Sequence, residues 1–133
     1  MANDIKEKDR EYRPLVYVAS AYSGDTAANT EKTKQYCRYA LEQGQIPLAP
    51  HLMFPLFMND ADPEERELAI FMDVILLGKC DELWVFGDRI SEGMKTEIDV
   101  AKKRRQKIRY FKASMQEVKF EKRGRRLDNV KRA

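Results

Sequence analysis

The chain has 133 residues, of which 43% are hydrophobic and 35% are charged, and its net charge is +3. This length and composition favour one globular domain that buries a core without disulfide bonds. Its apolar stretches fall short of the roughly 20 residues of a membrane span, and its charged first residues do not resemble a secretory signal peptide. We therefore expect a cytoplasmic protein that does not cross a membrane.

Basic residues are concentrated at the C-terminal end of the chain. Residues 102–133 hold 14 of the 25 Lys and Arg residues but three of the 22 Asp and Glu residues. We divide the chain into a flexible lead (1–13), a folded domain (14–112) and a basic C-terminal helix or tail (113–133). The tail could bind nucleic acid, remain solvated, or pair with the acidic body of a partner chain.

Cysteine usage gives no sign of a metal or redox centre. The two cysteines are Cys37 and Cys80, and their spacing matches no zinc or redox motif. We interpret both as small buried apolar residues and expect neither a metal nor another cofactor.

The first half of the chain predicts two strands with a helix between them, over residues 15–19, 45–49 and 26–43. The first strand, LVYVA, is rich in β-branched and aromatic residues, which is typical of a buried strand. The next six residues, SAYSGD, have turn-forming chemistry, and Gly44 is suited to end the helix. Three prolines argue against a helix directly after the second strand: Pro47, Pro50 and Pro55.

A second helix is expected to begin at Asp62 and run to Gly78. Asp62 is suited to cap it, Pro63 fits its first turn, and the acids that follow favour the positive end of its dipole. Further on, the pattern predicts a strand, a helix, a strand and a last helix, over residues 83–86, 92–105, 108–111 and 114–122. This alternation predicts an α/β fold with a mainly parallel sheet of four to five strands and helices on both faces.

Glu97 is the first candidate for a catalytic residue. It lies beside the apolar stripe that Met94, Ile98 and Ala101 form on their helix. A carboxylate just beyond the carboxyl end of a strand lies where open α/β folds place their chemistry. The alternative is a solvated Glu, or one paired with a lysine, at the edge of an amphipathic helix.

Asp73 is the single charged residue between Leu68 and Leu77. A helix that is apolar on nearly every side is buried on nearly every side, so we expect a second chain to cover part of it. An Asp in such a helix must find a partner, or its pKa rises. It could cap or pair with a nearby loop, or it could join Glu97, because two carboxyl groups in different environments are typical of glycosidic bond cleavage.

The ends of the predicted strands supply candidates for substrate binding. Small and hydroxyl-bearing residues between a strand and a helix can form an anion-binding cradle, although plain turns have the same composition. His51, the single histidine, follows the second strand and is either structural or in contact with a ligand. Tyr17 lies within the first strand and would by itself be interpreted as core. The loop candidates are Ser20, Tyr22, Ser23 and Gly24 after the first strand, and Asp88, Ser91 and Gly93 after the third.

At these residues the chain resembles the nucleoside 2-deoxyribosyltransferase superfamily, in particular its nucleotide N-glycosidase branch and uncharacterised phage and bacterial members. The matching segments are residues 16–25, 47–52, 80–87 and 91–98, together with Asp73. The resemblance implies a flavodoxin-like (Rossmann-like) fold and a homodimer or dimer-based oligomer in which a neighbouring chain can complete the site.

The resemblance also implies roles for the candidate residues. Glu97 would be the nucleophile, Tyr17 would orient it, and Asp73 would assist the leaving base or hold the sugar. Ser91 and the first loop would hold a 5′-phosphate, with His51 near the substrate. The first loop departs from the nucleotide hydrolases, because it carries Tyr22 and lacks their arginine.

We therefore predict an N-glycosidase or deoxyribosyltransferase that cleaves the base–sugar C–N bond of a (deoxy)nucleoside or its 5′-monophosphate. A non-catalytic nucleotide-binding module on the same fold is the main alternative. The others are a nucleic-acid-binding protein that acts through the basic tail and an enzyme that cleaves a nicotinamide dinucleotide.

Overall fold

The computed structural model describes residues 11–22 and 24–119 of the chain. Ser23, most of the predicted lead and most of the predicted tail therefore lie outside the described residues. In chain order the elements are β1 (Leu15–Ala19), α1 (Thr26–Glu42), β2 (Ile46–Leu48), α2 (Pro50–Met53), the 3-10 helix η3 (Phe54–Leu56), α3 (Pro63–Gly78), β3 (Glu82–Phe86), α4 (Glu92–Lys103), β4 (Lys107–Phe111) and β5 (Glu117–Val118).

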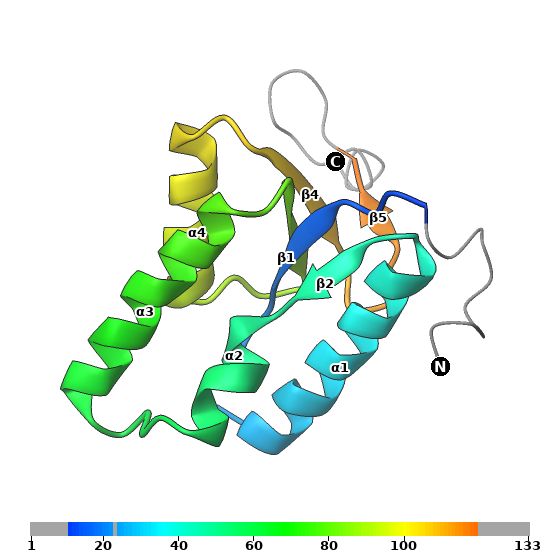
Figure 1. The fold of residues 1–133 in the computed structure, drawn as a ribbon. Coiled ribbons are helices and arrows are strands. Elements are labelled where there is room, and N and C mark those ends of the chain that lie inside the picture. The colour runs from blue at the N-terminus through cyan, green and yellow to red at the C-terminus, as the bar shows by residue number, and fades with distance from the viewer. Residues whose placement is uncertain (1–10, 23, 120–133) are drawn as a thin grey trace, which may run out of the picture.

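The sheet has five strands in the order β2-β1-β3-β4-β5. The first three pairings are parallel, and β5 is antiparallel to β4. Helices α3 and α4 lie on one side of this sheet and α1 lies on the other (Figure 1). The predicted α/β fold with a mainly parallel sheet and helices on both faces is confirmed.

Alternate residues of the central strands build the two halves of the core, because successive side chains of a strand point to opposite faces. Tyr17 and Ala19 pack with Leu83 and Val85 beneath α3 and α4. The intervening residues pack under α1 with its inner residues: Val16, Val18, Trp84, Phe86, Tyr36 and Ala40. The strands thus divide one run of apolar residues between two layers of helices.

Helix α3 begins as the sequence predicted. The side chain of Asp62 accepts a hydrogen bond from the Glu64 N–H at 3.0 Å, and Pro63 occupies the first turn. Gly44, with a φ of 81°, turns the chain after α1, also as predicted. These boundaries come from local chemistry, which is why sequence patterns find them.

The prediction that prolines keep helix out of the segment after β2 is wrong. Pro50 is the first residue of α2, where the missing N–H breaks no hydrogen bond, and Pro55 lies inside the short η3. Pro50 therefore starts a helical turn, and Pro55 lies within the first turn of the next helix. The result is a compact connection that brings His51 and Phe54 to the carboxyl end of the sheet.

The helix predicted over residues 114–122 is also wrong as far as the structure describes that segment. Met115 adopts a φ of 73°, which no α-helix accommodates, and Glu117 and Val118 pair with β4. Arg109 holds the new strand by two hydrogen bonds to the Glu117 carboxylate, at 2.9 and 2.7 Å. The folded sheet therefore extends beyond residue 112.

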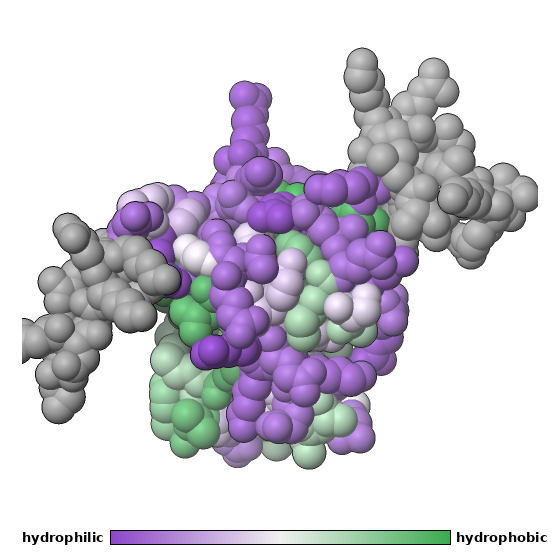
Figure 2. Space-filling view, turned by 90° about the vertical axis from the view of Figure 1, so that its right-hand side faces the viewer, coloured by the Kyte–Doolittle hydropathy of each residue, from purple (hydrophilic) through white to green (hydrophobic). Residues whose placement is uncertain are grey.

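The face seen from the side of α1 is mostly hydrophilic, with smaller hydrophobic patches (Figure 2). Helix α1 buries Thr33, Tyr36 and Ala40 and exposes chiefly polar residues. Within the part of the chain that the structure describes, every helix is too short or too polar to cross a bilayer.

Candidate active site

A cavity of about 500 Å³ lies where α3 and α4 meet the loops that follow β1 and β2. This is the carboxyl end of the parallel strands, where open α/β folds bind their ligands. Seven of the residues predicted from the sequence line it: Ser20, Tyr22, His51, Asp73, Ser91, Gly93 and Glu97.

Tyr17 connects the cavity to the sheet. Its ring is buried in β1 beside Leu83, and its Oη donates a hydrogen bond to Oε2 of Glu97. Burial, the negative charge of Glu97 and that of Asp73 raise the pKa of Tyr17, so it remains a donor at neutral pH. The structure thus brings together Tyr17 and Glu97, which lie 80 residues apart in the sequence.

Glu97 is a weaker acid than an ordinary carboxyl group. Burial raises its pKa to about 7, the hydrogen bond from Tyr17 acts in the opposite direction, and the charge of Asp73 adds to the rise. A carboxyl group with this pKa is partly protonated and partly ionised at neutral pH. Such values concentrate at functional sites, although structural networks produce them too.

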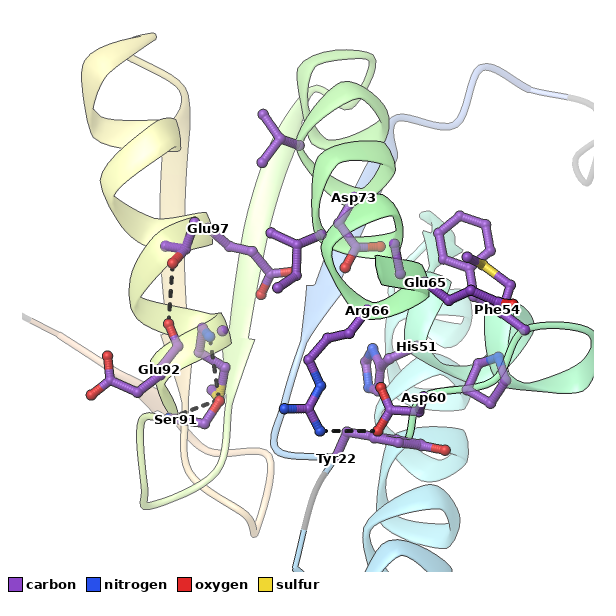
Figure 3. Close-up of a pocket in the computed structure, with 18 of the residues that line it drawn as sticks. Tyr22, His51, Phe54, Asp60, Glu65, Arg66, Asp73, Ser91, Glu92 and Glu97 are labelled. Atoms are coloured by element: carbon purple, nitrogen blue, oxygen red, sulfur yellow. Dashed lines mark hydrogen bonds and ion pairs between the residues drawn. The ribbon is translucent and has the colours of Figure 1, made fainter. Parts of the chain in front are cut away.

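Asp73 lies on the inner side of α3. Its Oδ1 is buried and has no hydrogen-bond partner among the described residues, and burial raises its pKa to about 7. Figure 3 shows that Asp73 and Glu97 both point into the cavity, from α3 and α4 respectively. Two carboxyl groups so placed favour a state in which one is ionised and the other holds a proton.

His51 is held by two hydroxyl groups. Its Nε2 lies 3.1 Å from Ser20 Oγ and 3.2 Å from Thr33 Oγ1, and the two hydroxyl oxygens are 2.7 Å apart. The rings of Tyr22 and His51 pack in a T-shaped arrangement, with 6.1 Å between their centroids. Burial lowers the pKa of His51 to about 4, so the imidazole is neutral at pH 7.

Ser91 and Gly93 stand at the start of α4. Ser91 caps the helix, because its Oγ accepts a hydrogen bond from the Met94 N–H at 3.3 Å. A Cβ at Gly93 would meet no atom within 4 Å, so the space above this residue is open to a ligand. The start of α4 therefore borders the cavity with Ser91 and Gly93, and with Glu92 and Met94 beside them.

Two other candidates lie apart from this cavity. Asp88 lines a second cavity of about 280 Å³ with Ser20, Lys32 and Arg89, and Gly24 lines neither cavity. Gly24 instead adopts a φ of 97° just before α1, a conformation that favours glycine.

Arg66 was missed by the sequence analysis. It lies two turns before Asp73 on α3, it lines the cavity, and its guanidinium is 3.7 Å from Asp60. Figure 3 shows it extending toward the space between Ser91 and His51. The i, i+3, i+4, i+7 spacing of Arg66, Ala69, Ile70 and Asp73 was the signal that could have placed it here. A cation thus enters the site from α3 and not from the first loop.

Thr33 was missed as well. It is fully buried in α1, and its Oγ1 donates to the Asn29 carbonyl oxygen at 2.8 Å. Its position three residues before Tyr36 and seven before Ala40 marks the inner face of α1. That face predicts burial but gives no sign of contact with His51.

Nothing in the described residues assembles a metal site, since they contain no group of three or more His, Cys, Asp or Glu side chains suited to hold an ion. Cys37 and Cys80 are free thiols, and neither lines the cavity.

Comparisons with known proteins agree with this fold. A family model described as "Domain of unknown function (DUF7768)" matches residues 14–111. No curated protein matches the chain. Among solved structures, the chain is similar to a 2-deoxyribosyltransferase from the psychrotolerant bacterium Bacillus psychrosaccharolyticus, a biocatalyst for the synthesis of antiviral and antitumoral nucleosides. The TM-score is 0.57 at 17% identity, over 74% of this chain and 72% of that one. The likeness confirms the flavodoxin-like fold and a relationship to 2-deoxyribosyltransferases at the level of the fold.

Proposed function

The chain belongs to the DUF7768 family, and we propose that it cleaves the C–N bond between base and sugar in a (deoxy)nucleoside or its 5′-monophosphate. The observation that carries this proposal is the partly buried hydrogen bond from Tyr17 to Glu97 at a cavity that Asp73 also lines. The fold shared with a 2-deoxyribosyltransferase supports the same reaction class.

Glu97 acts as the nucleophile. The hydrogen bond from Tyr17 fixes one carboxylate oxygen, which leaves the other to attack C1′ of the sugar. The C1′–N bond breaks through an oxocarbenium-like transition state, and its electron pair leaves with the base. A glycosyl ester of Glu97 results, and water or a second base then attacks C1′ and releases the carboxylate.

Asp73 acts as the acid toward the leaving base. Its raised pKa of about 7 keeps a proton available near neutral pH, and its unpartnered Oδ1 needs a donor or a proton. A departing base takes that proton on a ring nitrogen and leaves as a neutral molecule. The ionised Asp73 can then accept a hydrogen bond from the incoming water or base.

The remaining walls suit the other parts of a nucleoside. Phe54, Pro55 and Met58 form an apolar wall on the side of α2 and η3, where a flat base can pack. Arg66 supplies a guanidinium that a 5′-phosphate can accept hydrogen bonds from, beside the capped start of α4. This arrangement favours a nucleotide as well as a nucleoside.

A second copy of the chain is proposed to cover the outer side of α3. Three large apolar residues are exposed there, with Phe71 at 61% exposure. Apolar patches of this kind mark interaction sites in soluble proteins. The other two are Leu68 and Ile75, whereas the exposed Ile70 lines the cavity.

The direct test is base release. The purified protein is incubated with a panel of nucleosides, 5′-nucleotides and a nicotinamide dinucleotide, and free base is measured by chromatography. We expect release from at least one nucleoside or nucleotide, with a loss of about a thousandfold or more in Glu97→Gln. A second free base in the mixture separates transfer from hydrolysis.

Two outcomes would overturn the proposal. Ligand-induced shifts in melting temperature without base release, equal in wild type and Glu97→Gln, would favour a non-catalytic binding module. Full activity in Glu97→Gln would exclude Glu97 as the nucleophile. Lys79→Gln is a matched control, since Lys79 caps α3 outside the cavity and should leave the rate unchanged.

A further inference from the structure

The hydroxyl of Thr33 joins Ser20 and His51 into one buried cluster behind the cavity. Thr33 Oγ1 lies 2.7 Å from Ser20 Oγ, 3.2 Å from His51 Nε2 and 2.8 Å from the Asn29 carbonyl oxygen. Thr33 itself is fully buried, whereas Ser20 and His51 line the cavity. The cluster therefore reaches the ligand space through Ser20 and His51.

The direction of every hydrogen bond in this cluster follows from one carbonyl group. A carbonyl oxygen accepts and never donates, so the single proton of the Thr33 hydroxyl goes to Asn29. Thr33 Oγ1 can then only accept from its two other neighbours. Ser20 Oγ must donate its proton to Thr33, and His51 Nε2 must carry a proton as well.

The same accounting fixes the tautomer of His51. The neutral ring has one N–H, and the opposite tautomer would set Nε2 as an acceptor against the Thr33 oxygen, which has no proton left to donate. With the proton on Nε2, all three contacts among these side chains are satisfied, since Nε2–H is shared between Thr33 and Ser20. Nδ1 then carries a lone pair and makes no hydrogen bond to another described residue.

We propose that Thr33 is a positioning residue that turns this corner of the cavity into an acceptor-only surface, which recognises an exocyclic amino group on the base of the substrate. Ser20 Oγ and His51 Nδ1 offer lone pairs to the ligand, and neither has a proton to give. This inference rests on the proposed function for the identity of the ligand. It does not rest on that function for the proton directions.

The base, and not the sugar, meets this corner because of where the apolar wall lies. His51 belongs to α2, and the residues that follow it, Phe54, Pro55 and Met58, line the same side of the cavity. Tyr17 fixes Glu97, and with it the sugar carbon, on the side of α4. A base that packs on the apolar wall brings its exocyclic group toward His51 and Ser20.

The first test observes the tautomer directly. Because the chain contains a single histidine, a long-range ¹H–¹⁵N spectrum of the uniformly labelled protein reports on His51 alone. We expect the Nε2–H tautomer in the wild type and in Thr33→Ser, which keeps the hydroxyl. Thr33→Val removes it and should give a mixture of tautomers. A wild-type spectrum of the Nδ1–H form would overturn the inference, whatever the enzyme does.

The second test compares bases that differ in the exocyclic group. Binding of adenosine against inosine, and of cytidine against uridine, is measured by calorimetry in the Glu97→Gln background, which prevents turnover. We expect the amino member of at least one pair to bind about tenfold tighter or more, because the carbonyl member leaves buried acceptors unpaired. The preference should fall toward unity in Thr33→Val and return in Thr33→Ser.

The two proposals can fail separately. Amino-selective binding without base release in any assay would overturn the proposed C–N bond cleavage and support the acceptor-only corner. Base release with equal binding within both pairs would leave the enzyme standing and overturn the acceptor corner. Circular dichroism of the two Thr33 variants confirms that each comparison is made on folded protein.

Discussion

The two faces of the sheet use alternate residues of the same strands for opposite purposes. Under α1, aromatic rings stack in a closed row, with centroid distances of 4.6 Å from Tyr36 to Phe86 and 4.7 Å from Phe86 to Phe111. Trp84 lies beside them at 4.9 Å from Phe111. The core cluster on this aromatic face consists of apolar and aromatic side chains.

The face under α3 and α4 carries polar groups inside its apolar layer. Tyr17 and Glu97 hydrogen-bond there, and Asp73 keeps an unpartnered buried oxygen. The pKa of both carboxyl groups is raised to about 7, which means that the fold opposes their ionisation. The comparison indicates that packing on the aromatic face stabilises the fold. The two buried carboxyl groups on the opposite face lower its stability and belong to the candidate site.

The largest expected effect is on stability and comes from the aromatic face. Phe86→Ala removes the ring between Tyr36 and Phe111 and leaves a cavity in a fully buried layer. We expect the free energy of unfolding to fall by about 3–5 kcal/mol, measured by urea denaturation. A loss below about 1 kcal/mol would mean that the stacked row does not hold the fold together.

The next effect is on catalysis and comes from the opposite face. Tyr17→Phe keeps the ring but removes the donor to Glu97, so the carboxylate loses its orientation and its pKa rises further. We expect kcat for base release to fall by about 10–100-fold, and the acidic limb of the pH–rate profile to move to higher pH.

The shift of the pH profile separates positioning from structure. A variant that merely unfolds in part would lose activity at every pH without moving the limb. An unchanged kcat would show that the hydrogen bond contributes nothing to the reaction. The proposed catalytic role of the face under α3 and α4 would then lose its support.

The sequence predicted the parts of the molecule that local patterns determine. β1 was placed correctly because its β-branched and aromatic run is short and bounded, and α3 because Asp62 and Pro63 form a local start signal. The stripe beside Glu97 placed that residue on the inner side of α4. Its hydrogen bond with Tyr17 came from the resemblance to a family, since no local pattern joins residues that far apart.

Sequence patterns do not predict the features that depend on the tertiary fold. Pro50 starts a helix because the first helical position needs no N–H donor, although a series of prolines argues against a helix. β5 exists because β4 offers a free edge and Arg109 a partner for Glu117. Arg66 and Thr33 sit on helix faces that the pattern shows to be inward, yet the element that each one meets is set by the tertiary fold.

A smaller effect tests whether the site weakens the fold. The folded pKa of Glu97, about 7, lies above its ordinary value of 4.5, so its stabilising contribution is present below pH 4.5 and is lost as the pH rises through 7. Glu97→Gln removes this loss. We expect the variant to be more stable than the wild type by about 1–2 kcal/mol at pH 8, with the difference vanishing near pH 4.

The measurement is the free energy of unfolding of both proteins at several pH values. A variant that is less stable than the wild type at pH 8 would show that the ionised Glu97, with its hydrogen bond from Tyr17, supports the fold. The proposal that one face stabilises the fold and the other lowers its stability would then be wrong.

The smallest effect concerns the charged pair that borders the aromatic face. Arg109 lies 4.5 Å above the centroid of Trp84 and holds Glu117, and this partnership lowers the pKa of Glu117 to about 2. A lowered pKa gives stability that is present above pH 4.5 and is lost as the pH falls toward 2, the reverse of Glu97. Glu117→Gln should reduce stability at pH 7 by up to about 1 kcal/mol, because water and salt screen a partly exposed pair.

The loss of stability in Glu117→Gln should shrink in 1 M salt, whereas the gain of stability in Glu97→Gln should persist because burial and not a surface charge causes it. An equal response of both variants to salt would remove the physical distinction between the two faces.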